Sequence, residues 1–96
     1  MYILVTYDVD TISNSGQKRL RQVARICKNY GQRVQNSVFE CEVTEAQLCI
    51  LKNDLRNAMN ESLDSIRIYQ LNKNKKHSIE TLGKNNSFDV NEVLVL

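Results

Sequence analysis

The sequence predicts an α+β fold in which an antiparallel sheet carries both of its helices on one face. Apolar residues run or alternate in several short segments, as in strands, and recur at helical spacing in two longer segments. These segments follow one another as strand, helix, strand, strand, helix, strand, which is the order of the ferredoxin-like βαββαβ arrangement. The 96 residues are therefore expected to form one domain, and so short a chain buries too little surface to be very stable unless a second subunit covers more of it.

The first strand is predicted over residues 2–9, where β-branched, aromatic and leucine residues continue as far as Asp8. Side chains alternate between the two faces of a strand, and here both faces carry apolar residues. The helices can cover only one face, so the other is expected to meet a second subunit. The face expected to meet that subunit carries Tyr2, Leu4, Thr6 and Asp8, and the other carries Ile3, Val5, Tyr7 and Val9.

A helix is predicted from Gln17, after the polar loop of residues 11–16, with Gly31 as its stop. No Asp or Glu occurs between Asp10 and Glu40, so the outer face of this helix is wholly cationic. A charged outer face is ordinary on an amphipathic helix. A merely solvated helix usually mixes signs, however, so this face favours contact with the phosphates of a nucleic acid. The inward residues are Leu20, Val23, Ala24 and Cys27, and the outward cations are Lys18, Arg21, Arg25 and Lys28.

Residues 32–43 return to extended character and are predicted to form two short strands joined near Asn36 and Ser37, with one long kinked strand as the alternative. Thr44 followed by Gln47 is a capping-box pattern, which predicts that a second helix begins there. Leucine residues recur at helical spacing after this pattern, so the second helix is expected to continue to about residue 60.

The last part of the chain is predicted to contain two strands and a tail. Residues 65–71 alternate as in a strand, residues 72–77 form a polar loop, and residues 78–82 are expected to be a short fifth strand. The chain then ends in the apolar run 93–96, which would be an aggregation hazard if left bare. We therefore expect the segment 78–96 to dock on the partner subunit of a dimer.

Several classes of protein are disfavoured by composition. Cys27, Cys41 and Cys49 are odd in number and widely spaced, which indicates reduced thiols rather than a disulfide framework or a zinc site. The N-terminus lacks the pattern of a signal peptide, and no apolar run approaches the roughly 20 residues that span a bilayer. The protein is expected to be soluble and cytoplasmic, without a membrane partner. No glycine-rich phosphate loop or serine nucleophile pattern occurs, which argues against nucleotide hydrolysis and serine hydrolase chemistry.

Asp8 is the candidate for chemistry, because it is a carboxylate that closes an apolar strand beside a basic stretch of sequence. Magnesium takes about six oxygen ligands and commonly only one or two carboxylates, keeping several waters. One Asp for each chain is too few, but two chains related by a two-fold axis near this strand would supply two. The alternative is a strand-end Asp that accepts backbone hydrogen bonds. Asp10 and His77 lie in polar loops and are weaker candidates.

Three segments together resemble the small adaptation protein of CRISPR systems, CRISPR-associated protein two. They are Leu4–Val9, which contains the Tyr-Asp pair, the basic run Lys18–Arg21, and Gly31–Cys41. Within the third segment, the sequence Arg-Val-Gln-Asn-Ser-Val-Phe-Glu at residues 33–40 is distinctive. The similarity extends through the second helix and the following strand, to about residue 71.

The resemblance implies a ferredoxin-like homodimer whose sheets pack face to face, with Asp8 of each subunit holding a divalent cation, magnesium or manganese. Members of this family are described as metal-dependent endonucleases that act on duplex DNA or on single-stranded RNA. They also form the central dimer of the complex that integrates new spacers, where they bridge two dimers of the larger CRISPR integrase subunit. By position, Asp8 is the catalytic and metal-binding residue, Arg19, Arg21 and Arg33 bind nucleic acid, and Tyr7, Ser37 and Phe39 support the site.

Two functions remain open at this point, and they are compatible with each other. In the first, Asp8 and its cation cleave a phosphodiester bond while the arginines hold the phosphates. In the second, the protein is a non-catalytic scaffold whose basic helices hold duplex DNA. A related toxin-type ribonuclease of the same fold is an alternative to both, and a ligand-sensing domain of this fold is disfavoured by the resemblance.

Overall fold

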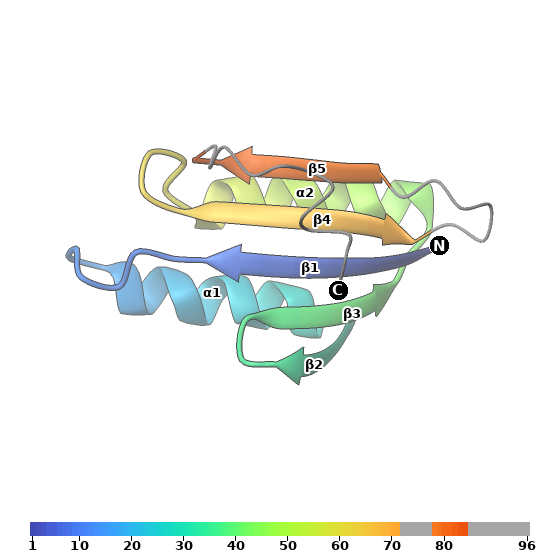
Figure 1. Ribbon diagram of the computed structural model, residues 1–96, viewed down its shortest axis with the longest axis horizontal. Coiled ribbons are helices and arrows are strands. Elements are labelled where there is room, and N and C mark those ends of the chain that lie inside the picture. Colours follow the sequence, from blue (N-terminus) through green and yellow to red (C-terminus); the bar gives the residue numbers. More distant parts are fainter. Residues whose placement is uncertain (72–77, 85–96) are drawn as a thin grey trace.

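The computed structural model describes residues 1–71 and 78–84 (Figure 1). The predicted order of strands and helices is confirmed, including the additional strand after the sixth element. The elements are β1 (Tyr2–Asp8), α1 (Gly16–Lys28), β2 (Gly31–Gln35), β3 (Val38–Glu42), α2 (Glu45–Ala58), β4 (Ser65–Leu71) and β5 (Ser78–Gly83).

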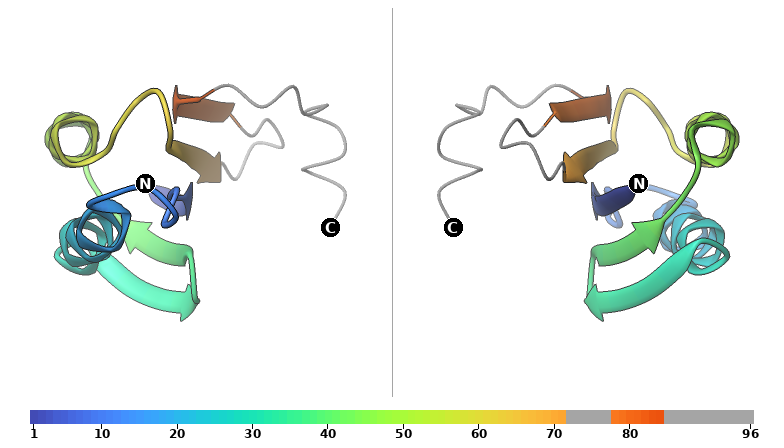
Figure 2. Two further views of the ribbon diagram at one scale, coloured as in Figure 1. Left: turned by 90° about the vertical axis from the view of Figure 1, so that its left-hand side faces the viewer. Right: turned by 90° about the vertical axis from the view of Figure 1, so that its right-hand side faces the viewer.

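The five strands form one antiparallel sheet in the order β2-β3-β1-β4-β5. Figure 2 shows that α1 and α2 lie together on one side of this sheet. The ferredoxin-like α+β fold predicted from the sequence is therefore confirmed. β5 extends it by pairing with β4 of the same chain. Residues 85–96 lie outside the described part of the chain, so the docking of the segment 78–96 on a second subunit stays a prediction.

The core lies between the sheet and the helices, and β1 is at its centre. Ile3, Val5 and Tyr7 are 0%, 0% and 5% exposed, so alternate residues of β1 point toward the helices. Neither helix is long and apolar enough to cross a bilayer, and the described residues contain no other helix that could. The same buried cluster also contains Val23, Cys27, Phe39, Cys41, Leu51, Leu55, Ile66 and Ile68.

Local sequence signals explain where α2 begins and where β2 turns into β3. Both halves of the predicted capping box are present at α2: the hydroxyl of Thr44 accepts from the N–H of Gln47 at 3.1 Å, and the amide oxygen of Gln47 accepts from the N–H of Thr44 at 2.9 Å. The predicted turn at Asn36 and Ser37 separates β2 from β3. A register shift between Arg33 and Gln35 leaves one extra residue in β2, which is typical of a β-bulge.

Two glycines are required by close packing of the backbone. The prediction that Gly31 stops α1 is wrong, because the helix ends at Lys28 and Gly31 is the first residue of β2. A Cβ atom at Gly31 would lie 2.0 Å from the carbonyl oxygen of Glu40 on the neighbouring strand. A Cβ atom at Gly16, the first residue of α1, would lie 2.1 Å from the carbonyl oxygen of Asp10. The loop that follows Asp8 therefore passes directly against the start of α1.

Candidate functional site

Asp8 is the last residue of β1, and its side chain is exposed on the face of the sheet that the helices leave uncovered. This placement follows from alternation along β1, because Tyr7 and Val5 occupy the helix side. In the ladder between β1 and β4, Asp8 lies opposite Ser65 and Thr6 lies opposite Arg67. These four residues share one face of the sheet at the end of two central strands.

A shallow hollow of about 300 Å³ opens beside Asp8. Its polar groups are the hydroxyls of Thr6, Ser37 and Ser65 and the guanidinium of Arg67, which lie around one carboxylate, and Val38 and the aromatic residues add apolar surface. Ser37, one of the residues predicted to support the site, is thus brought to Asp8. The hollow is lined by Thr6, Tyr7, Asp8, Ser37, Val38, Ser65, Arg67 and Tyr69.

The donor set at this hollow fits a magnesium ion that keeps most of its waters. Among residues 1–71 and 78–84, no group of three or more His, Cys, Asp or Glu side chains could hold a metal by itself. The nearest acid in sequence, Asp10, stabilises its own loop, since its Oδ1 accepts a hydrogen bond from the N–H of Ile12 at 2.9 Å. Asp8 can supply one carboxylate, which suffices only for a water-rich site or for one shared with a second chain.

Tyr7 and Phe39, which were predicted to support the site, are buried on the opposite face of the sheet. Their rings stack with centroids 6.1 Å apart, and the guanidinium carbon of Arg33 lies 5.3 Å from the centroid of the Phe39 ring. The hydroxyl of Tyr7 donates to the carbonyl of Asn36 at 3.3 Å, and the Tyr7 N–H donates to the carbonyl of Ser37 at 3.1 Å. Tyr7 thus ties the β2–β3 turn to the end of β1.

Burial raises the pKa of Tyr7 above its ordinary value of 10.0, although the nearby charge of Arg33 acts in the other direction. A phenol that holds its proton so firmly is unsuited to act as a general base near neutral pH. The geometry therefore gives Tyr7 a packing role next to Asp8 rather than a role in proton transfer.

The structure separates the two arginines that were predicted together at the start of α1. Arg21 is exposed, in line with Lys18, Arg25 and Lys28 on the outer surface of the helix. We call these four residues the basic stripe. The side chain of Arg19 is only 12% exposed, and its Nε lies 2.8 Å from Oδ2 of Asp64, whose side chain is 0% exposed. Arg19 thus lies in a buried ion pair and not on the basic stripe.

The basic stripe and Asp8 lie on opposite sides of the sheet. α1 is in the helix layer (Figure 2). Asp8 is exposed at the end of β1, on the face opposite to that of the buried residues Val5 and Tyr7. A ligand that contacts both within one chain has to pass around the edge or the end of the sheet. The cation that shares a hollow with Asp8 is Arg67 on β4.

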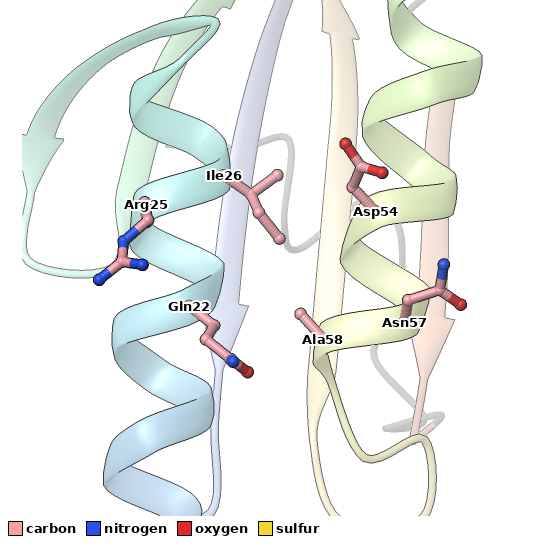
Figure 3. A pocket seen from close by; sticks show the side chains of 6 residues that line it. All are labelled: Gln22, Arg25, Ile26, Asp54, Asn57 and Ala58. Atoms are coloured by element: carbon pink, nitrogen blue, oxygen red, sulfur yellow. The ribbon is translucent and has the colours of Figure 1, made fainter.

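A second hollow, of about 350 Å³, lies between α1 and α2 (Figure 3). Ile26 and Ala58 face each other across it, and polar side chains border it on both helices. Asp54 is its only carboxylate, and none of its residues comes from the strand end that carries Asp8. We therefore place the candidate chemistry at Asp8. The polar residues at this hollow are Gln22, Arg25, Asp54 and Asn57.

Two residues at the strand end were not identified from the sequence, Asp64 and Arg67. Arg67 could have been found, because the alternation of β4 places it on the same face as Asp8 once β1 and β4 are paired. Asp64 had no comparable signal. Its partner Arg19 is 45 residues away in the chain, and an acid before a strand is usually a turn residue.

Comparison with known proteins identifies the family. The family model described as CRISPR associated protein Cas2 matches residues 1–79. The CRISPR-associated endonuclease Cas2 of Halalkalibacterium halodurans is 52% identical over 95 residues, covering 99% of this chain and 99% of the relative. The CRISPR-associated endoribonuclease Cas2 1 of Moorella thermoacetica is 52% identical over 96 residues, 100% of both chains. The crystal structure of Streptococcus pyogenes Cas2 is 57% identical with a TM-score of 0.71, covering 77% of this chain and 89% of that one.

Proposed function

The chain belongs to the Cas2 family of CRISPR-associated proteins, and on that premise we propose that it is a metal-dependent endonuclease and a DNA-binding dimer of CRISPR adaptation. The observation that carries the nuclease proposal is the position of Asp8, an exposed carboxylate beside hydroxyl groups and the guanidinium of Arg67 in a hollow at the end of a central strand. The similar proteins named endonuclease and endoribonuclease support the same activity. The substrate is the phosphodiester backbone of duplex DNA or single-stranded RNA.

The uncovered face of the sheet supports a homodimer packed face to face. Tyr2 and Leu71 lie opposite each other at one end of this face and are 49% and 38% exposed. Leu4 and Tyr69 form the next pair on the same face, and both are only partly buried. A second copy related by a two-fold axis near β1 would cover these side chains and bring a second Asp8 to the first.

In this proposal Asp8 of each subunit holds the magnesium or manganese ion. The ion supplies stabilisation of the negative charge that develops on the phosphate during cleavage. Asp8 orients that site from a fixed strand end, and Arg67 in the same hollow offers positive charge to the phosphodiester. The hydroxyls of Thr6, Ser37 and Ser65 offer further hydrogen bonds at the hollow.

The scaffold function is supported by a different observation, the separation of the basic stripe from Asp8. A duplex held along the outer surface of α1 can bind without its backbone reaching the hollow on the other side of the sheet. Contacts from Lys18, Arg21, Arg25 and Lys28 go to phosphates and would position DNA without reading its sequence. This arrangement fits a dimer that presents duplex DNA to a larger integrase subunit.

The nuclease proposal is tested with wild-type protein, Asp8→Asn and the matched control Asp54→Asn, which makes the same chemical change on α2. Each is incubated with labelled duplex DNA and labelled single-stranded RNA in Mg²⁺, in Mn²⁺ and in EDTA. We expect cleavage by wild type and Asp54→Asn only when metal is present, and none by Asp8→Asn. Duplex binding by Asp8→Asn should persist. Metal-dependent cleavage that survives in Asp8→Asn would remove Asp8 from the mechanism, and binding without cleavage by wild type would leave the scaffold function alone.

A further inference from the structure

Asp64 is a fully buried carboxylate with four hydrogen-bond donors around it. Its side chain is 0% exposed. Oδ2 accepts from Nε of Arg19 and from the N–H of Asn60, both at 2.8 Å. Oδ1 accepts from the N–H of Asp10 at 3.0 Å and from Nη2 of Arg19 at 3.3 Å. Burial alone would raise the pKa of Asp64, but the hydrogen bonds from Arg19, Asn60 and Asp10 outweigh it and hold the pKa below its ordinary value of 3.8.

Two connections lead from Asp64 to Asp8. Asp64 directly precedes Ser65, the residue opposite Asp8 in the ladder between β1 and β4. Its side chain also binds the N–H of Asp10, two residues beyond Asp8. Asp64 is therefore connected to the end of β1 in two ways, through the paired strand β4 and through the loop that follows Asp8.

Arg19 also donates three hydrogen bonds to the same loop. Its Nη2 donates to the carbonyl of Asp10 at 3.1 Å and to the hydroxyl of Ser13 at 3.2 Å, and its Nη1 donates to the carbonyl of Asn14 at 3.4 Å. All three nitrogens of the guanidinium thus donate to groups of the protein. An arginine that contacts DNA phosphate directs its donors outward, whereas Arg19 directs them at Asp64 and at the loop after Asp8.

We propose that Arg19 and Asp64 are positioning residues that fix the strand end carrying Asp8, and that Arg19 does not bind phosphate. The expected effect on cleavage rests on the proposed nuclease function, because Arg19 and Asp64 influence the phosphodiester only through the position of Asp8. The loop between Asp10 and Gly16 is already constrained by close packing against α1, and the ion pair fixes its other contacts. Loss of the pair frees the backbone on which Asp8 is carried.

The main test uses the paired variant Arg19→Gln/Asp64→Asn. It removes both charges together, so that no buried charge is left unpaired, and replaces them with amides that can still hydrogen-bond. The matched controls are Arg21→Gln, on the basic stripe, and Arg56→Gln, an exposed arginine of α2. Duplex affinity is measured in EDTA over a series of salt concentrations. Manganese affinity and single-turnover cleavage at saturating duplex are measured separately.

If Arg19 is a positioning residue, the paired variant keeps the salt slope of wild type, while its manganese affinity and cleavage rate fall about 10- to 100-fold. Arg21→Gln should instead lower the log-log salt slope by about 0.9 for each Arg21 of the dimer that contacts a phosphate of duplex DNA. Arg56→Gln should change neither the slope nor the cleavage rate. The inference is overturned if the salt slope of the paired variant falls by about 0.9 or more, or if the variant keeps both the manganese affinity and the cleavage rate of wild type.

Arg19→Lys provides a second test that keeps the charge and does not depend on the folding of the paired variant. Lysine carries all of its donors on one nitrogen, so it cannot reproduce the contacts that Nε, Nη1 and Nη2 of Arg19 make at separate positions. Cleavage by Arg19→Lys should therefore fall at least several-fold, with the salt slope unchanged, and wild-type cleavage in this variant would contradict the positioning role. The two proposals fail in different ways. Cleavage that survives in Asp8→Asn refutes the nuclease proposal, whereas a lower salt slope of duplex binding in the paired variant refutes only the positioning role of Arg19.

Discussion

Substituting Arg19 by Met should destabilise the protein far more than removing any arginine of the basic stripe. The substitution keeps most of the side-chain volume but deletes both hydrogen bonds to Asp64, at 2.8 and 3.3 Å. The carboxylate that remains is 0% exposed and keeps only two backbone donors. Leaving one partner of a buried ion pair uncompensated typically costs about 3 to 5 kcal/mol. That is a large share of the roughly 5 to 15 kcal/mol that stabilises a small domain.

The same substitution should cost much less when Asp64 is replaced by Asn. The buried charge is then absent, and the remaining loss is about two ordinary hydrogen bonds, near 1 kcal/mol each. The coupling free energy between the two positions is therefore expected to be about 1 to 3 kcal/mol, within the range for residues in direct contact.

Equilibrium unfolding in urea measures these differences for wild type, both single variants and the double variant, at one protein concentration because a dimer is expected. With an m-value near 1.5 kcal/mol/M, the midpoint of Arg19→Met should fall by about 2 to 3 M. The exposed control Arg56→Met should change the free energy of unfolding by less than about 0.5 kcal/mol. The ion pair does not stabilise this strand end if Arg19→Met lowers the free energy of unfolding by less than about 1 kcal/mol. The same conclusion follows if the substitution lowers it equally in wild type and in Asp64→Asn.

Two further predictions concern pH and the thiols. The pKa of Asp64 is lower in the folded chain than its ordinary value of 3.8, so its stabilising contribution is complete well above pH 3.8 and is lost as the pH falls through the folded pKa. In that acid range the urea midpoint of wild type should approach the midpoint of Asp64→Asn. A difference between the two midpoints that stays constant with pH would contradict the assignment. Burial raises the pKa of Cys27 to about 12 and raises that of Cys41, whereas Cys49 is exposed. In native protein at pH 8, a disulfide reagent should therefore modify Cys49 rapidly and the other two only after unfolding, and Cys49→Ser should abolish the rapid phase.

The sequence predicted those features that depend on local periodicity. Alternation along β1 was enough to place Asp8 opposite the helices, and the capping box of Thr44 and Gln47 marked the start of α2. Helical phase also carried information about Arg19. Lys18, Arg21, Arg25 and Lys28 follow one another at spacings of three or four, and Arg19 falls outside that series.

The features that could not be predicted from the sequence depend on contacts between residues that are far apart in the chain. Gly31 is needed because the carbonyl of Glu40 passes too close for any side chain, which becomes visible only when β2 and β3 are paired. Asp64 is marked by no local pattern, and its role depends on Arg19 and Asp10 meeting it in three dimensions. A motif match aligned Arg19 with the basic start of the helix but gave no information about the direction of its guanidinium.

The opposite positions of Asp8 and the basic stripe have a consequence for how the two proposed functions relate. In the proposals above, a duplex is held by charges that project from the helix layer, and cleavage takes place at a strand end on the other side of the sheet. Since no contact in the described residues joins Asp8 to Arg21 or Arg25, loss of one function need not disturb the other. Arg19 is the residue at which they could be confused, because it lies on α1 beside the basic stripe while its hydrogen bonds run to the loop after Asp8. A loss of cleavage on substituting Arg19 is therefore not a measure of DNA contact, and only the salt dependence of binding separates the two roles.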